Sequence, residues 1–204
     1  IVKLLLDNSA HVNAQGGFFG NALQAASSGG YEQTVKLLLD KGANVNAQGG
    51  EYDNALYAAS YGGYEQIVKL LLDKGANANA QGGSFGNALH AASLGGNKQI
   101  VKLLLDKGAN VNAQGTQFVS ALRAASFGGC EQVMKLLINK GADVNTQGEL
   151  RDDPLYVASS RGYEQIVKLL LDKGANVHDN ALRAASGERH ERIVRLLQKH
   201  NKAS

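Results

Sequence analysis

The chain has 204 residues, among them 25 glycines, 1 proline, 7 tyrosines, 5 phenylalanines and 1 cysteine. Its 21 basic and 18 acidic residues leave a formal charge of +3, a weak field for attracting nucleic acid. An apolar content of 44% excludes wholesale disorder, the lone Cys130 excludes a disulfide framework or a cysteine-rich zinc site, and no apolar run approaches the roughly 18 residues of a membrane span.

The single cysteine also fits a reducing, intracellular (cytoplasmic) location. The only methionine, Met134, lies inside the chain rather than at its start. We therefore expect a fragment of a larger protein.

One sequence unit recurs along the whole chain. The string Lys-Leu-Leu-Leu-Asp-Lys-Gly-Ala-Asn starts at Lys36, Lys69, Lys102 and Lys168, with a variant at Lys135, and neighbouring copies lie 33 residues apart. The chain then divides into a partial repeat (1–20), full repeats (21–53, 54–86, 87–119 and 120–152), a shortened repeat (153–179) and a C-terminal capping repeat (180–204). We expect these repeats to form a single array.

Each repeat predicts a short first helix, such as 22–28. The residue before this helix is a good N-cap in every repeat: Asn21, Asn54, Asn87, Ser120, Asp153 and Asn180. The only proline, Pro154, follows such a cap at the first helical position, where its missing N–H costs nothing. A glycine pair, Gly29 and Gly30 in the first full repeat, is expected to end the helix.

A second helix is predicted at 32–41, with Val35, Leu38 and Leu39 on one face. Gly42 is expected to end it in the left-handed conformation, as are its counterparts in later repeats. The polar stretch that follows, such as 43–53, is long enough for a hairpin finger. Because one pair of short helices cannot bury its apolar face alone, the pairs should stack into an all-α solenoid.

The ends and one junction depart from this pattern. The repeat at 153–179 lacks six residues before Asn180, so we expect no full hairpin at that junction. Residues 1–20 begin inside a second helix and lack a first one, which leaves an uncapped apolar edge. We expect fraying or self-association through this edge.

The 33-residue period, the Asn-Ala-Leu-x-Ala-Ala-Ser opening at 21–27 and the Lys-Leu-Leu-Leu-Asp-Lys-Gly-Ala-Asn-Val-Asn close at 36–46 resemble the ankyrin repeat over essentially the whole chain. The resemblance implies an ankyrin-repeat solenoid of helix-turn-helix units with short hairpin fingers. It also implies that first helices and fingers form a concave surface that binds partners. The family's Thr-Pro-Leu-His motif is altered here: Pro154 keeps its second residue and His90 its fourth. The near-identical repeats are similar, in addition, to the ankyrin arrays of fungal NACHT-type receptors.

Differences between the repeats gather on the face that the resemblance marks for binding. The fourth and eighth positions of the first helix vary and lie four residues apart, so they share a helix face. The finger tips vary as well. From these three sets we predict the partner-binding residues Gln24, Ser28, Tyr52, Tyr57, Tyr61, Phe85, His90, Leu94, Phe118, Arg123, Phe127, Arg151 and Tyr156.

The aromatic residues fall on fingers and first helices, away from the leucine-rich core face. Exposed rings are frequent binding anchors. The finger row, consisting of Phe19, Tyr52, Phe85 and Phe118, has a structural alternative, namely stacking of one finger on the next. For Tyr31, Tyr64 and Tyr163, which follow the glycine pair, we favour a structural role.

A row of basic residues runs along the second helices: Lys3, Lys36, Lys69, Lys102, Lys135, Lys168 and Arg195. Glutamates four residues earlier and aspartates four residues later are placed to neutralise most of them. We interpret this row as a solvated outer face rather than a nucleic-acid stripe, and we expect neither a nucleic-acid nor a membrane partner.

No sequence motif for catalysis, phosphate binding or metal binding is present, and the five histidines lack metal-ligand spacing. We therefore predict no enzyme activity, no catalytic residues, no cofactor and no metal. The leading hypothesis is a protein–protein interaction module. The alternatives are the ligand-sensing region of a fungal nucleotide-binding receptor and a consensus-like engineered scaffold; an enzyme or a nucleic-acid binder has no support in the sequence.

Overall fold

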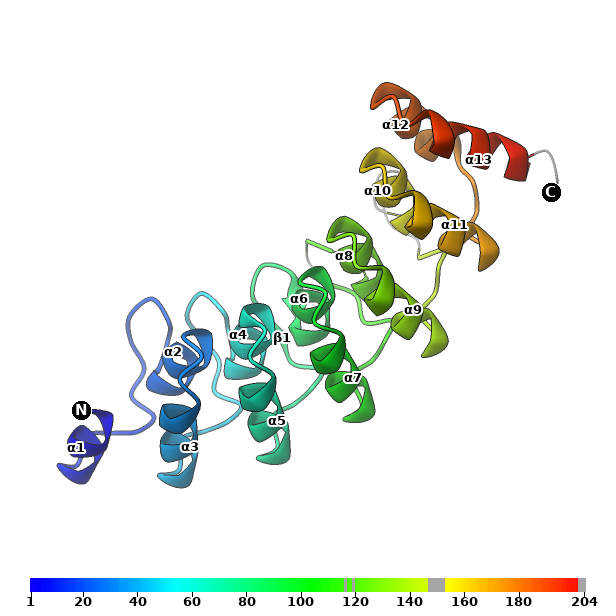
Figure 1. Cartoon of the computed structure of the whole chain (residues 1–204). Coiled ribbons are helices and arrows are strands. Elements are labelled where there is room, and N and C mark those ends of the chain that lie inside the picture. The colour runs from blue at the N-terminus through cyan, green and yellow to red at the C-terminus, as the bar shows by residue number, and fades with distance from the viewer. Residues whose placement is uncertain (116, 119, 147–152, 202–204) are drawn as a thin grey trace. The chain divides into compact units, whose positions relative to one another are not determined.

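The computed structural model describes residues 1–115, 117–118, 120–146 and 153–201, and Figure 1 shows helix pairs following one another along the chain. The chain divides into two compact units. The N-terminal unit comprises residues 1–92 and 99–110, and the C-terminal unit comprises residues 93–98 and 111–204. Both are built almost entirely from helices, which confirms the predicted fold class.

The N-terminal unit holds α1 (Val2–Asp7), α2 (Ala22–Ser28), α3 (Glu32–Asp40), α4 (Ala55–Gly62), α5 (Glu65–Asp73), and most of α6 (Ala88–Leu94) and α7 (Lys98–Asp106). In this unit α2 packs on α3 within one repeat and on α4 of the next, while α3 packs on α5. First helices therefore contact first helices, and second helices contact second helices.

The C-terminal unit repeats this arrangement. It holds α8 (Ala121–Phe127), α9 (Glu131–Asn139), α10 (Pro154–Ser160), α11 (Glu164–Asp172), α12 (Asp179–Gly187) and α13 (Glu191–Asn201). Helix α10 contacts both α8 and α12, and α11 contacts both α9 and α13.

Side-chain caps start the first helices at the predicted places. The Oδ1 atom of Asn21 accepts the backbone N–H of Gln24, and the caps at Asn54, Ser120 and Asp153 accept the N–H three residues later in the same way. The prediction for Asn180 was wrong. Helix α12 already begins at Asp179, whose negative charge suits the positive end of a helix.

The core of each unit consists of aliphatic side chains from both kinds of helix. In the second helices Val35, Leu38 and their counterparts are buried, as the helical spacing predicts. In the first helices small residues such as Ala59 and Ala92 are fully buried and allow close approach. The second helices from α3 to α11 are each followed by a glycine in the left-handed conformation, with φ +85° at Gly42.

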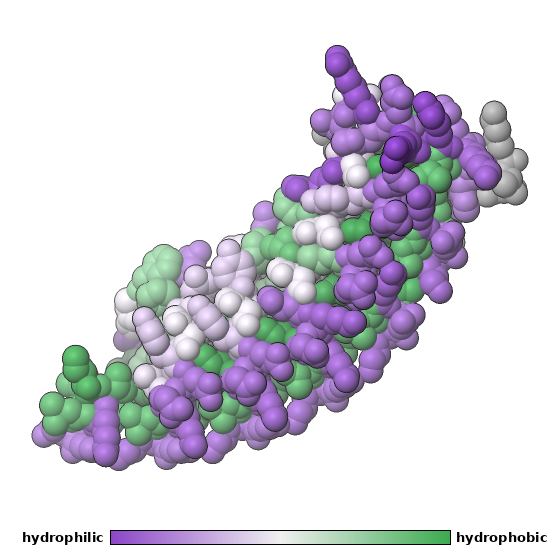
Figure 2. Space-filling view, in the orientation of Figure 1, coloured by the Kyte–Doolittle hydropathy of each residue, from purple (hydrophilic) through white to green (hydrophobic). Residues whose placement is uncertain are grey.

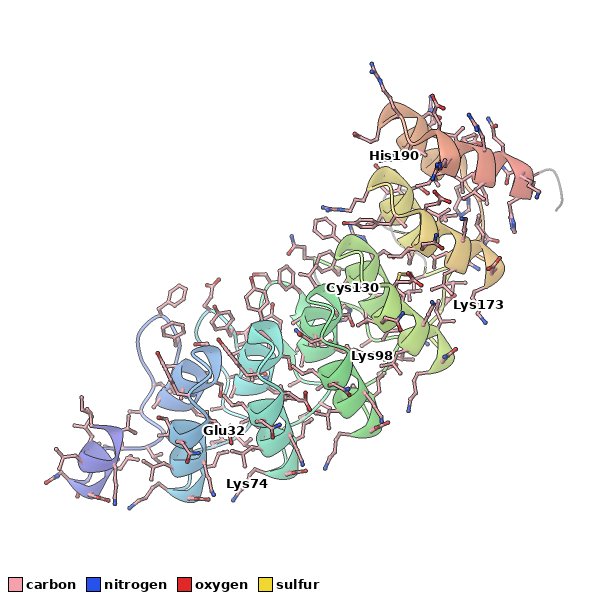
Figure 3. All side chains as sticks on the ribbon, viewed as in Figure 1. Glu32, Lys74, Lys98, Cys130, Lys173 and His190 are labelled. Carbon is pink, nitrogen blue, oxygen red and sulfur yellow. The ribbon has the colours of Figure 1, made fainter. Side chains whose placement is uncertain are left out.

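The glycine pairs also make room for the ring that follows them. A side chain at Gly30 would collide with the ring of Tyr64 in the next repeat, and one at Gly62 would collide with the same ring within its own repeat. This ring is therefore held between two glycines from neighbouring repeats. In the C-terminal unit Cys130 and His190 occupy the equivalent position, each against a glycine of the preceding repeat (Figure 3).

An asparagine ladder, formed by Asn13, Asn46, Asn79, Asn112 and Asn145, joins successive repeats. The Nδ2 group of Asn46 donates to the carbonyl oxygen of Gly75 at 3.0 Å, and its Oδ1 atom accepts the backbone N–H of Asn77 at 2.8 Å. Each member of the ladder makes the same two bonds to the next repeat. One side chain thus satisfies two backbone groups beyond the end of a second helix.

The fingers are short and mostly irregular. One contains a two-stranded antiparallel ribbon, in which β1 (Gln81–Gly82) pairs with β2 (Gly86–Asn87). Between α11 and α12 the chain passes through residues 173–178 without a strand, so the predicted absence of a full hairpin is confirmed for this junction.

We predict that Asn145→Ala lowers the free energy of unfolding by about 1–2 kcal/mol, because two hydrogen bonds to Gly174 and Asn176 are lost. Urea unfolding followed by circular dichroism measures the change. His178 occupies the ladder position at the last junction, and its imidazole has no amide with which to form this pair of bonds, so His178→Ala is the matched control with little effect. Equal losses in the two variants would contradict the role of the ladder.

Candidate functional site

The fourth position of the first helix is buried in the N-terminal unit, which corrects the expectation that it is presented to a partner. The exposed fraction is 1% for Gln24, 2% for Tyr57 and 0% for His90. The side chains of Gln24 and Tyr57 contact the fingers instead of lying at the surface. In this structure these three side chains therefore have almost no surface exposed to a partner.

The buried fourth positions hold the fingers in place. The Nε2 group of Gln24 donates to the carbonyl oxygens of Ala47 and Asp53, both in the next finger, at 3.2 and 2.8 Å. The backbone N–H of Phe85 donates to the hydroxyl of Tyr57 at 3.4 Å, again in the next finger. Different side chains perform the same task in successive repeats, which gives the variation at this position a structural cause.

Burial also changes the acidity of Tyr57. It raises the pKa of the phenol to about 12, and the hydrogen bond from Phe85 opposes part of this increase. The hydroxyl therefore stays protonated, and available to the finger, across the physiological pH range.

The eighth position of the first helix reaches the surface. Tyr61 is 49% exposed and Phe127 is 39% exposed, while Ser28, Leu94 and Ser160 are half-buried. The hydroxyl groups of Ser28 and Ser160 donate hydrogen bonds to backbone carbonyl oxygens of their own helices. The two aromatic residues at this position therefore offer the largest exposed apolar area.

Six rings of the N-terminal unit form a continuous aromatic stripe: Phe18, Phe19, Tyr52, Tyr57, Tyr61 and Phe85. The rings of Phe19 and Tyr52 stack with their centroids 6.2 Å apart, as finger-on-finger stacking predicts. Tyr52 lies 6.0 Å from Tyr61, and Tyr61 lies 5.7 Å from the ring of Phe85 on the following finger. Tyr61 also stacks on the buried Tyr57 at 6.3 Å. Phe18, at the start of the stripe, is largely exposed.

The C-terminal unit has a smaller cluster in which arginines cover the rings. Phe118 is buried, contrary to the expectation for a finger tip, and its ring centroid lies 5.5 Å from that of Phe127. The guanidinium of Arg123 lies 5.2 Å from the Phe118 centroid, and that of Arg161 lies 3.6 Å from the Phe127 centroid. Tyr156 is half-buried, and the predicted Arg151 lies outside the described residues.

Two adjoining grooves lie at the N-terminal edge of the stripe. One has a volume of about 560 Å³ and is lined by α2 together with Val2, Phe19 and Tyr52. The other has a volume of about 380 Å³ and lies beside the first finger, against Phe18 and Phe19. Neither groove contains an acidic or basic side chain. These grooves therefore suit apolar groups.

Ion pairs neutralise the opposite face, formed by the second helices. Lys135, Lys168 and Arg195 contact the glutamates four residues earlier, as predicted. The aspartates, however, do not pair as predicted with the lysines four residues earlier on their own helices.

Asp40 and Asp73 pair with Lys74 and Lys107 of the next repeat, at 3.4 and 2.8 Å, rather than with the lysines of their own helices. The cause is that the last turn of each second helix lies beside that of its neighbour. Lys107 accordingly lowers the pKa of Asp73. Lys74 is labelled in Figure 3.

Groups suited to catalysis or metal binding do not gather in the described part of the chain. No set of three or more His, Cys, Asp or Glu residues there is placed to hold a metal ion. Burial raises the pKa of Cys130, which disfavours the reactive thiolate. None of the described helices has both the length and the apolar character needed to cross a bilayer.

Comparison with known families agrees with this geometry. A model of three consecutive ankyrin repeats matches residues 1–82, 23–115, 79–148 and 121–204, which together span the chain. The chain belongs to the ankyrin repeat family. Ankyrin repeats are in general protein–protein interaction modules, and no enzyme family is indicated.

Among solved structures, the human ASB11 ankyrin repeat domain is similar, with 27% sequence identity and a TM-score of 0.80. The match covers 88% of this chain and 83% of that domain. A search of curated proteins finds no match.

We predict that one tyrosine titrates near pH 12 and that it is Tyr57. Because folding raises its pKa above 10.0, its contribution to stability is complete below pH 10 and is lost as the pH rises towards 12. Tyrosinate absorbance and urea unfolding between pH 9 and 12 measure both effects, and the loss attributable to Tyr57 should not exceed about 3 kcal/mol. In Tyr57→Phe the late titration should disappear, whereas Tyr61→Phe should retain it.

Proposed function

We propose that this ankyrin array is a non-catalytic module that binds another protein through its first helices and fingers. The aromatic stripe of the N-terminal unit is the observation that carries the proposal. Three of its rings, Phe18, Phe19 and Tyr61, are exposed to solvent. Polar residues are abundant elsewhere in the chain. Aromatic residues clustered at a surface are frequent centres of binding energy.

The buried residues beneath the stripe support the same function indirectly. Gln24 and Tyr57 bond to successive fingers, so the rings of Tyr52 and Phe85 are held before any partner arrives. A preformed surface lowers the conformational entropy that binding must overcome. The proposed contact residues are therefore the exposed and half-buried members of the predicted set, and Gln24, Tyr57, His90 and Phe118 become supporting residues.

An affinity pull-down from cell lysate tests this proposal. We expect Phe18→Ala/Tyr61→Ala to lose the partners that the wild-type chain retains, since two exposed rings are removed without disturbing the core. The control, Lys36→Ala/Lys69→Ala, alters the second helices on the opposite face and should retain those partners. Identical partner sets for all three proteins would refute binding through the stripe.

We also propose that the N-terminal edge associates with a second copy of the chain. Helix α1 has no buried residue, and Ile1, Leu4 and Leu5 are more than half exposed. Figure 2 shows hydrophobic atoms gathered at this end of the molecule, and the 560 Å³ groove begins beside it at Val2. Contact between two such edges would remove this apolar surface from water.

Light scattering at increasing concentration tests this self-association. We expect the wild-type chain to form dimers and Leu4→Lys/Leu5→Lys to remain monomeric. Leu196→Lys, a change to a half-buried leucine at the other end of the chain, is the control for general effects of adding charge. A monomeric wild-type chain at high concentration would contradict the proposal.

A reducing, intracellular location belongs to the same proposal and is supported by the half-buried free thiol of Cys130. The receptor and scaffold hypotheses remain alternatives for the parent protein. The coding sequence upstream of Ile1 distinguishes them, because a receptor requires a nucleotide-binding domain there.

A further inference from the structure

Aromatic rings and arginines are distributed unequally between the two units. The aromatic stripe lies in the N-terminal unit, whereas every arginine of the chain lies at or after Arg123, in the C-terminal unit. Lysines occur in both units, so the difference concerns the guanidinium group rather than positive charge in general.

In the C-terminal unit an arginine already lies over the ring at the eighth position of a first helix. The guanidinium of Arg161 lies 3.6 Å from the ring centroid of Phe127, which is van der Waals contact with its face. A planar guanidinium stacks on an aromatic face and is attracted to it electrostatically. This pair therefore shows that a ring at the eighth position of a first helix accommodates a guanidinium group.

Tyr61 is the counterpart of Phe127 in the N-terminal unit, because both occupy the eighth position of a first helix. Its ring neighbours are aromatic: Tyr52, Tyr57 and Phe85. No cation of the described chain lies over the rings of Tyr61, Tyr52 or Phe19. By sequence position, the residue corresponding to Arg161 is Gly95, which has no side chain.

The charges beside the stripe also favour a cation. Residues 13–30 and 46–63, which form two fingers and the helices α2 and α4, contain just two charged residues, Glu51 and Asp53. Both are exposed and flank Tyr52 in the sequence. The carboxylate of Asp53 accepts the backbone N–H of Gly83, which directs this charge toward the next finger. In the N-terminal unit the lysines lie on the second helices or directly after them instead.

We propose that the aromatic stripe binds an arginine side chain of an extended partner segment, with the guanidinium stacked on Tyr61 and its charge balanced by Glu51 and Asp53. This inference rests on the proposed protein-binding function and adds the chemistry of the partner. The partner would thus supply to the N-terminal unit the group that Arg161 supplies within the C-terminal unit.

The test uses the whole chain and a capped peptide, Gly-Ser-Gly-Ser-Arg-Ser-Gly-Ser-Gly, titrated by nuclear magnetic resonance. Two matched peptides carry lysine or citrulline at the centre; citrulline keeps the planar shape of arginine without its charge. We expect the arginine peptide to shift the ring signals of Tyr61 and Tyr52 and to bind more tightly than either control peptide. We expect Tyr61→Leu to weaken its binding by roughly two- to fivefold.

A second variant gives a test by gain of binding. Arg161→Ala uncovers the ring of Phe127, so we expect the arginine peptide to shift the Phe127 signals in this variant and not in the wild-type chain. This variant leaves the stripe intact. Because the expected result is a gain of binding, loss of folding cannot explain it.

The outcomes are distinguishable. Equal binding of the lysine peptide, unchanged binding by Tyr61→Leu, or no shift of the stripe signals would each overturn the arginine proposal. The pull-down with Phe18→Ala/Tyr61→Ala is independent of these peptides. If that variant loses partners while the arginine peptide fails to bind, the protein-binding function stands and the arginine chemistry falls.

Discussion

The structure depends on contact between repeats, because no pair of short helices in this chain can bury its apolar face alone. Hydrogen bonds between repeats and a close steric fit between repeats accompany that burial. The asparagine ladder satisfies backbone groups across the junctions from Asn13 to Asn145, and Gly30 leaves room for the ring of Tyr64 from the next repeat. Both require a constant spacing in space between neighbouring repeats.

The same spacing organises the binding face. A finger is too short to fold alone, and its conformation is fixed by a side chain from the preceding first helix. Gln24 does this through its amide, and Tyr57 does it through its hydroxyl. As a result, rings from three fingers and one helix come within stacking distance of one another. A surface assembled in this way belongs to the array rather than to any single repeat.

Much of the fold could be predicted from the sequence because its signals are local. The caps at Asn21 and Asp153, the left-handed Gly42 and the missing finger before α12 each depend on a few adjacent residues. The candidate site was harder to predict. Helical spacing places Gln24 and Ser28 on one face, but it does not reveal that the next finger folds over the first of them. The pairing of Asp40 with Lys74 was missed for a similar reason, since it depends on how neighbouring helices align.

The replacement of a ladder asparagine by His178 has a consequence for how the array comes apart. The last repeat keeps the packing of α12 on α10 and of α13 on α11, together with an ion pair between Arg192 and Glu164, but its ladder position holds an imidazole in place of the amide that bonds at earlier junctions. Repeat arrays open from their weakest interface. The C-terminal repeat is therefore where thermal unzipping of the C-terminal unit should start, and proteolytic trimming would follow the same direction.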